Sequence, residues 1–296
     1  MKLFRLCALL LGMFMAHTAA SADIRVVVSI APIHSLVAGV MEGVGAPRLL
    51  VRGGASPHSF AMRPSDSRAM NEADLIIWVG EGLESFLPKV LASLSPGAKI
   101  TELMENPRIR LLDGRKPGVW DDHEHSGKDP HIWLSPENAK AIARISADAL
   151  IKRDPDNAKT YAANVARVAE GIDQAARTIG AQIAPLADEP FVMFHDSFRY
   201  FEEAFDLKPL GALTVNPERM PGARRLARLR HEMARRKVKC VFREPQFSPK
   251  TVAMVAEGSG AQIGVIDPLG ADLPPGPALF LELMHNNAHA ITACLS

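Results

Sequence analysis

The sequence predicts an α/β protein made of two (β/α) lobes, each with a mainly parallel sheet, that are joined by one long helix. Three observations lead to this fold class. The 296 residues are 47% hydrophobic and 23% charged, an ordinary globular composition at a length that favours two domains. Apolar strand patterns alternate with helical patterns in both halves of the chain. Between the halves lies the longest helical pattern of the sequence.

The first half contains short, largely β-branched runs bounded by glycine or proline, which are typical of buried parallel strands. We expect strands at residues 24–30, 48–51 and 73–79, and helices at residues 35–41 and 65–70. Ser135, Pro136 and Glu137 have the order of an N-cap, a proline at the first helical position and an acid in the first turn. A further helix is therefore expected from there to residue 151.

The central pattern spans residues 157–184, where Ala162, Val165, Val168 and Ile172 recur at three- and four-residue spacing. A helix of roughly 28 residues extends about 42 Å, which is longer than one domain layer. No heptad is sustained, so we expect a bridge between two domains and not a coiled coil.

The strand and helix alternation resumes after Pro190, and the two halves should enclose a cleft. Strands are expected at residues 191–194, 239–243 and 262–266, and helices at residues 224–235, 251–258 and 279–292. The predicted division is a signal peptide at 1–22, an N-terminal lobe at 23–155, the linker helix at 156–186 and a C-terminal lobe at 187–296.

The first 22 residues have the order of a cleavable signal peptide. Lys2 and Arg5 form a positive start, residues 9–15 are apolar but too few to span a bilayer, and residues 20–22 (Ala-Ser-Ala) fit a cleavage site. A buried N-terminal helix is the alternative. We expect export and a mature chain that begins at Asp23.

Charge and hydropathy disfavour two classes of protein. The formal net charge is +1 and no basic stripe stands out along the sequence, which argues against nucleic-acid binding. After the signal peptide, no stretch is long and apolar enough to predict a transmembrane helix.

Export would leave two cysteines, because Cys7 is lost with the signal peptide. Cys240 and Cys294 form an even pair in an oxidising compartment, which predicts a disulfide. Closing a loop of about 55 residues stabilises by roughly 4 kcal/mol in the chain-entropy model. The alternatives are two free buried thiols or, more weakly, a zinc site.

Three histidines occupy similar places in the predicted elements. His58 follows a glycine-rich loop after a strand, His131 precedes a capped helix, and His195 ends a strand. Strand ends of open α/β sheets face the binding crevice, so the three can converge. Three imidazoles and one open position suit zinc, although neutral imidazole also binds copper, iron and nickel. Each histidine alone is more typical of a solvated loop residue, and no H-x-x-x-H motif supports them.

Eight segments spread over nearly the whole chain after residue 22 carry a specific pattern. They are residues 53–58 (GGASPH), 63–66 (RPSD), 73–80 (ADLIIWVG), 131–137 (HIWLSPE), 194–196 (FHD), 214–218 (TVNPE), 244–247 (EPQF) and 267–270 (DPLG). Together they resemble the zinc ABC transporter substrate-binding proteins of the ZnuA type, in the cluster A-I metal-receptor family. The resemblance implies a rigid linker helix, a metal in the cleft, a periplasmic location and an ABC membrane permease as partner. We expect a monomer.

The resemblance also implies that His58, His131 and His195 are the histidine ligands of a transported Zn²⁺. The manganese branch of the family typically has a carboxylate as third ligand, so His195 favours zinc. Some zinc members carry an acid directly before the first histidine, where this chain has Pro57, which cannot ligate. The fourth ligand is then water or Asp267, and Asp267 could equally cap the turn that follows it.

Other polar residues are weaker candidates for a metal site. His123 and His125 lie in a short acidic loop at residues 121–125, which could hold a second, weak metal or could simply be solvated. Glu244 is expected to pair with an arginine or with backbone donors. His34, which follows the first strand, could line the cleft, but it is more typical of a histidine at the surface or at a helix start. Solvent-facing or packing roles are expected for the helical histidines His231, His285 and His289.

These features predict a high-affinity zinc receptor, and not an enzyme, that passes Zn²⁺ to an ABC import permease. A manganese or iron receptor of the same fold is one alternative. A secreted zinc hydrolase is another, because three histidines and an open position also suit a catalytic zinc. A hydrolase needs a general base, such as Glu244 or Asp267, and a substrate pocket, and no H-E-x-x-H motif is present.

Overall fold

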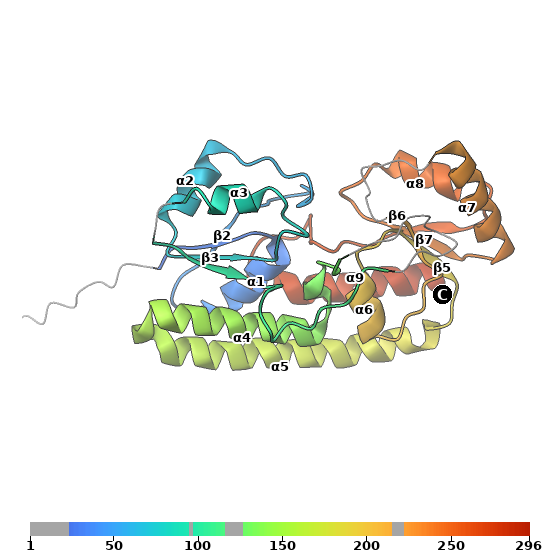
Figure 1. The fold of residues 1–296 in the computed structure, drawn as a ribbon. Coiled ribbons are helices and arrows are strands. Elements are labelled where there is room, and N and C mark those ends of the chain that lie inside the picture. The colour runs from blue at the N-terminus through green and yellow to red at the C-terminus, as the bar shows by residue number, and fades with distance from the viewer. Residues whose placement is uncertain (1–23, 95–96, 116–126, 215–221) are drawn as a thin grey trace, which may run out of the picture.

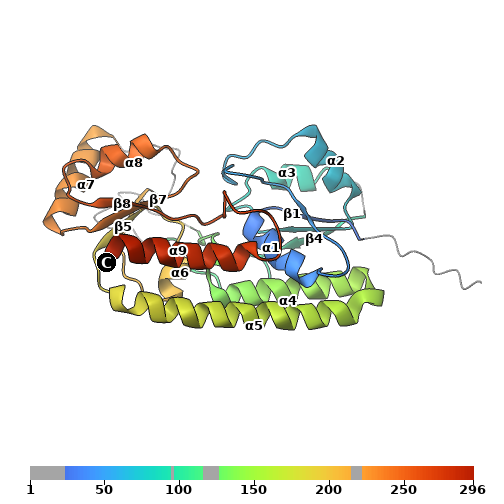
Figure 2. The same ribbon diagram turned by 180° about the vertical axis from the view of Figure 1, so that it is seen from behind.

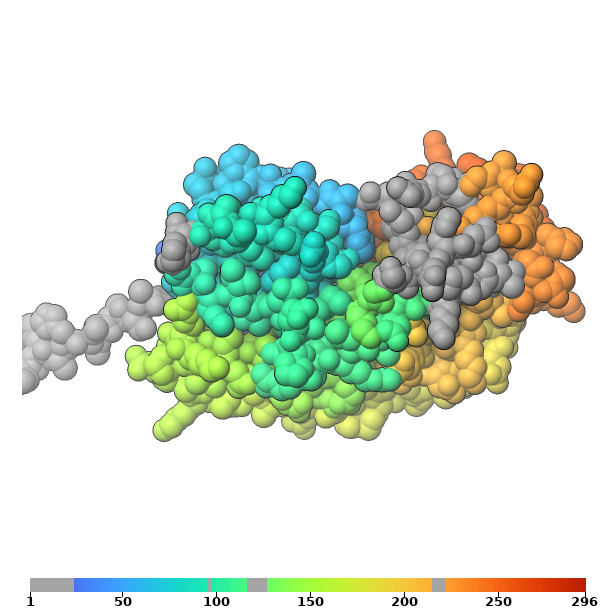
Figure 3. All heavy atoms as spheres, viewed as in Figure 1, coloured from blue at the N-terminus to red at the C-terminus, as the bar shows by residue number. Residues whose placement is uncertain are grey.

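The protein folds into two α/β lobes that stand side by side on a base of long helices (Figures 1 and 2). The computed structural model describes residues 24–94, 97–115, 127–214 and 222–296. The predicted signal peptide, His123 and His125 lie outside these residues. In the space-filling view the lobes form separate upper parts above a continuous lower body (Figure 3).

Each lobe contains a four-stranded parallel sheet, and the two sheets have equivalent strand orders. The N-terminal sheet runs β2-β1-β3-β4 and the C-terminal sheet runs β6-β5-β7-β8. The strands are β1 (Val26–Val28), β2 (Arg48–Leu49), β3 (Leu75–Trp78), β4 (Lys99–Glu102), β5 (Phe191–His195), β6 (Ala212–Thr214), β7 (Cys240–Arg243) and β8 (Gln262–Val265). The predicted fold class is confirmed.

Nine α-helices surround the sheets among the described residues. They are α1 (Ala31–Val40), α2 (Pro64–Glu72), α3 (Leu87–Leu91), α4 (Pro136–Arg153), α5 (Ala158–Ile183), α6 (Arg199–Ala204), α7 (Ala223–Arg235), α8 (Pro249–Ala256) and α9 (Leu279–Leu295). No helix in the described ranges combines the length and the apolar character needed to cross a membrane. In both views α2, α3, α7 and α8 lie on the side of the sheets away from α5 (Figures 1 and 2).

All six predicted strands exist, but two strands that the sequence did not predict complete the sheets. β4 and β6 are edge strands of the two sheets. Lys99–Glu102 has no fully buried residue, so it lacks the apolar run by which the central strands were recognised. Ala212–Thr214 is only three residues long, too short to show a periodicity.

Helix α1 begins earlier than predicted, and this changes the role of His34. The helix starts at Ala31 with Pro32 in its first turn, where a proline removes no intrahelical hydrogen bond. His34 therefore lies in the first turn of the helix, and its Nε2 lies 2.9 Å from the carbonyl oxygen of Pro47. Of the two predicted positions, the helix start is confirmed, and the surface position is wrong because the side chain is buried.

The predicted linker is present as α5, flanked by short 3₁₀ turns at Pro155–Asn157 and Ala184–Leu186. A second helix, α9, also connects the lobes. The sequence predicted a helix at residues 279–292 but not this connecting role. Helix α9 packs against α1, α5 and β8, and the amide of Phe280 donates to Ser35 Oγ of α1 over 2.9 Å. The predicted lobe boundaries therefore remain a prediction, because α9 belongs to the packing of both lobes.

The apolar core follows the same arrangement. The largest cluster of buried side chains runs from both sheets onto α1, α4, α5 and α9, and it is shared by the lobes. A smaller cluster underlies α2 and α3, and another underlies α7 and α8. The predicted disulfide is confirmed: it joins Cys240 of β7 to Cys294 of α9, with 6.0 Å between the Cα atoms.

Candidate metal centre

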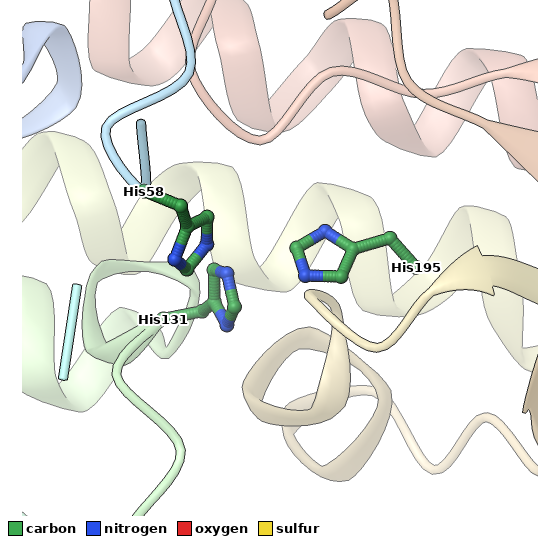
Figure 4. A group of neighbouring side chains, drawn as sticks. All are labelled: His58, His131 and His195. Carbon is green, nitrogen blue, oxygen red and sulfur yellow. The ribbon is translucent and has the colours of Figure 1, made fainter. Parts of the chain in front are cut away.

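The three predicted histidines come together between the lobes (Figure 4). His58 lies in the loop after β2, His131 directly precedes the 3₁₀ turn Ile132–Leu134, and His195 is the last residue of β5. Their ring centroids are 5.7, 5.5 and 5.2 Å apart. One nitrogen from each ring lies within 4.8 Å of the others, which is the convergence expected of ligands of one ion.

The space between the rings fits an ion and little else. His131 and His195 are each 4% exposed, and His58 is half-buried. The cavity that the three rings line has a volume of about 10 Å³, which corresponds to one water-sized sphere. Its remaining wall is largely apolar and is formed by Pro57, Leu83, Trp133, Phe247, Pro268 and Leu269, with Ser56, Glu244 and Gln246.

Two of the histidines are oriented by carboxylates. The Nδ1 atom of His131 lies 2.8 Å from Asp129 Oδ1. The Nδ1 atom of His195 lies 3.1 Å from Glu244 Oε1, which also accepts a hydrogen bond from Ser197. A carboxylate at Nδ1 favours the tautomer protonated there and leaves Nε2 with a lone pair for a metal, the usual outer shell of a histidine site.

The sequence interpretation assigned neither carboxylate to a histidine. Glu244 was expected to pair with an arginine or with backbone donors, but its carboxylate contacts His195 and Ser197. The place of Glu244 at a predicted strand end could have indicated this contact. Glu244 directly follows β7, and β7 pairs in parallel with β5, so the carboxyl ends of the two strands meet at the same edge of the sheet. Asp129 was not singled out, although it lies only two residues before His131.

The rings differ in their affinity for protons. Burial, together with the neighbouring His131 and His195, lowers the pKa of His58 to about 3. Burial alone would also lower the pKa of His195, but the charge and hydrogen bond of Glu244 outweigh it and raise this pKa above its ordinary value. As the pH falls, His195 therefore accepts a proton well before His58 does.

Asp267 is occupied by other contacts. Its Oδ1 atom accepts hydrogen bonds from the amide of Leu269 at 2.9 Å and from Gln246 Nε2 at 3.0 Å, and its Oδ2 atom accepts from the amide of Ala271 at 2.5 Å. Among the described residues, the group able to hold a metal comprises the three histidines without Asp267. These contacts favour the turn-capping role that the sequence left open.

The lobes meet around the histidines through hydrogen bonds that cross between them. The hydroxyl of Tyr200 in α6 accepts from the amide of Leu112 at 3.0 Å and donates to the carbonyl oxygen of Asp129 at 2.9 Å. Trp133 Nε1 donates to the carbonyl oxygen of Pro268 over 2.7 Å. The residues that hold His131 are thus fixed to the C-terminal lobe.

Arg115 adds two ion pairs to this contact between the lobes. Its guanidinium lies 2.9 Å from Asp196 Oδ1, next to His195, and 2.6 Å from Glu202 Oε2. Burial opposes ionisation of the arginine, but Glu202 and Asp196 raise its pKa overall. Burial raises the pKa of Glu202 to about 7, against the lowering effect of Arg115.

Two lobes that enclose three converging histidines define a metal-binding protein with its site at the lobe interface. The family model described as zinc-uptake complex component A, periplasmic (ZnuA), matches residues 26–294. The chain therefore belongs to the ZnuA family, which is a family of substrate-binding receptors.

Individual relatives agree with this assignment. The high-affinity zinc uptake system protein ZnuA of Brucella suis is 37% identical over 329 aligned positions, which cover 100% of this chain and 98% of the relative. A crystal structure of ZnuA superposes with a TM-score of 0.80 at 27% identity, covering 93% of this chain and 100% of that one. A manganese-bound periplasmic metal-binding protein from Candidatus Liberibacter asiaticus has a TM-score of 0.75 at 25% identity, covering 92% and 100%.

Proposed function

We propose that this protein is a periplasmic receptor that binds Zn²⁺ through His58, His131 and His195 and delivers it to an ABC import permease. The observation that carries the proposal is the convergence of three imidazole nitrogens in a cavity of ion size. The names of the relatives, which are high-affinity zinc uptake proteins, support zinc as the cargo and a permease as the partner. The predicted signal peptide supports export to the periplasm.

The donor set favours zinc over manganese, the cargo suggested by the manganese-bound neighbour. Three nitrogen donors suit zinc, whereas manganese prefers carboxylate, carbonyl and water oxygens. The carboxylates nearest the rings, those of Asp129 and Glu244, contact Nδ1 atoms and so act on the histidines rather than on the ion position. The fourth ligand is a water molecule in this proposal, with Asp267 kept in its turn.

A receptor also accounts for the site better than a hydrolase. A catalytic zinc needs room for a substrate and a general base beside the metal-bound water. The cavity of about 10 Å³ leaves space for little beyond the ion, and Glu244 is engaged with His195 and Ser197. The proposal therefore includes no catalytic step.

Single substitutions of the ligands test the proposal. His58→Ala, His131→Ala and His195→Ala are each expected to weaken Zn²⁺ binding by well over 100-fold, more than the 10–100-fold typical of losing an outer-shell partner. Isothermal titration of metal-free protein, with a competing chelator, measures the affinity. His285→Ala and His289→Ala, which alter exposed histidines of α9, are the matched controls.

Two results would overturn the assignment. Wild-type affinity in all three ligand variants would rule out this site. Stronger binding of Mn²⁺ than of Zn²⁺ by the wild type, measured by metal analysis after loading from a mixed pool, would make manganese the cargo.

A further inference from the structure

The charge of this protein is distributed very unevenly along the chain. Residues 223–239, which contain α7 and the turn after it, include eight arginines and lysines and a single acid, Glu232, so their formal charge is +7. The other residues carry 26 Lys and Arg against 32 Asp and Glu, a formal charge of −6. The net charge of +1 thus conceals a strongly cationic helix on an acidic protein.

Folding turns this segment into a cationic surface, contrary to the expectation that no basic stripe stands out along the sequence. Arg224, Arg228, His231 and Arg235 are exposed and follow one another at intervals of four, three and four residues, so they share one face of α7. This face is about 16 Å long at 1.5 Å per residue. The opposite face buries Leu229 and Met233 in the core of the C-terminal lobe.

Two neighbouring acids of the described residues pair with arginines of this segment. Glu232 lies 2.6 Å from Arg235 and 3.3 Å from Arg236. Arg230 reaches Glu257 of the turn after α8 at 2.7 Å. Counting both acids, residues 223–239 together with Glu257 still have a formal charge of +6.

Helix α7 is tied to α8, and α8 carries an exposed apolar residue. Arg230 donates two hydrogen bonds to the carbonyl oxygen of Met254, which ties α7 to α8. The Met254 side chain is 44% exposed, one of the largest exposures of an apolar side chain among the described residues. Helices α7 and α8 form the outer end of the C-terminal lobe, away from the linker helices (Figures 1 and 3).

We propose that this surface, made of Arg224, Arg228 and Arg235, docks on an anionic phospholipid membrane. Guanidinium groups bind phosphate oxygens in a bidentate manner, and basic residues on an amphipathic helix are attracted to anionic headgroups. A line of cations along one helix face suits a partner that offers many equivalent phosphates. This function goes beyond zinc binding: it concentrates the receptor at the membrane surface.

Vesicle co-sedimentation of the purified protein tests the proposal, with phosphatidylcholine vesicles and vesicles containing about 30% phosphatidylglycerol at low ionic strength. Each basic residue near an anionic surface strengthens binding about fivefold. The triple variant Arg224→Gln/Arg228→Gln/Arg235→Gln is therefore expected to bind the anionic vesicles about 100-fold more weakly than the wild type. Salt at about 0.5 M should release the wild type, because it screens exposed charges.

Two further variants separate charge from damage to the fold. Arg224→Lys/Arg228→Lys/Arg235→Lys keeps the charge and should retain most of the binding. Lys89→Gln/Lys152→Gln/Lys159→Gln removes the same charge from exposed positions of α3, α4 and α5 and should bind as the wild type does. Equal wild-type binding to both kinds of vesicle, or equal losses in the two glutamine triples, would overturn the proposal.

An acidic protein partner is the competing explanation, and the same variants detect it. If the wild type ignores phosphatidylglycerol, and the α7 glutamine triple nevertheless slows zinc transport by a reconstituted permease, then α7 contacts protein and the lipid proposal is wrong. The vesicle assay is run without zinc, so its outcome is independent of the zinc proposal.

Discussion

The two lobes share a strand order but support the metal site in different ways. The N-terminal lobe presents His58 and His131 from loops, whereas the C-terminal lobe presents His195 from the end of a central strand. His195 is held by Glu244 from the neighbouring strand end, and the sheet behind it is tied to α9 by the disulfide. The ring of His58 has contacts only with His131 and His195 among the interactions described here. The comparison teaches that the C-terminal lobe supplies one ligand, held by a carboxylate, whereas the N-terminal lobe supplies one ligand held in the same way, His131, and one whose ring contacts the other two histidines, His58.

The disulfide gives the largest expected difference in stability between the lobes. Replacing both cysteines, Cys240→Ala/Cys294→Ala, should lower the free energy of unfolding by about 4 kcal/mol, because the bond closes a loop of 54 residues in the unfolded chain. Urea unfolding followed by circular dichroism measures it. Reduction of the wild type is the control and should give a similar shift, whereas an unchanged midpoint after reduction would contradict the prediction.

The next largest loss in the free energy of unfolding is expected from a substitution at the contact between the lobes. Tyr200→Phe removes a hydroxyl that serves the amide of Leu112 and the carbonyl of Asp129, and it leaves both backbone groups buried without that partner. The expected loss is about 2 kcal/mol in the free energy of unfolding. Tyr161→Phe is the matched control, since the hydroxyl of Tyr161 binds Asp154 within the N-terminal part of the chain. Its expected loss is about 1.5 kcal/mol, because the hydroxyl binds a carboxylate, and a loss larger than that of Tyr200→Phe would reverse the comparison.

Substitutions of the two carboxylates test whether Asp129 orients His131 as strongly as Glu244 orients His195. Glu244→Gln and Asp129→Asn should each weaken zinc binding by about 10–100-fold, because each removes the negative charge that orients an imidazole. Titration calorimetry gives the affinities. Glu203→Gln, at a partly exposed glutamate of α6, is the control. Affinity unaltered in both variants would show that the carboxylates do not act through the rings.

The smallest expected effect is a pH dependence that differs between the two lobes. His195 has a raised pKa, so protons compete with zinc at this ring from above pH 6.5 downward, while His58, with a pKa of about 3, stays neutral. In metal-free protein, protonated His195 contributes stability below its unfolded pKa, and this contribution is lost as the pH rises through its folded pKa.

Zinc affinity measured from about pH 8 to pH 5.5 should therefore fall steadily. Glu244→Gln removes the group that raises the pKa of His195, so its decline should begin at a lower pH than that of the wild type. An affinity independent of pH over this range would contradict the proposed ligands.

The central strands could be predicted because their signal is local: continuous apolar runs mark β1, β3 and β5. The three histidines were indicated only weakly by their places beside strands and helices, and it is the resemblance of eight segments to a known family that implied them as one ligand set. Edge strands β4 and β6 were missed because partial exposure or shortness removes the apolar run. The position of α9 on α1 depends on packing between distant residues, which periodicity does not encode.

Helix α9 has a consequence for the order in which the molecule matures. The hydrogen bond from Phe280 to Ser35 joins residues 245 positions apart, so α1 acquires this neighbour only after nearly every other element has been synthesised. Cys240 must likewise wait for Cys294. Until α9 has formed, the apolar face of α1 that it covers is left open, and the N-terminal lobe, although it is made first, is completed last.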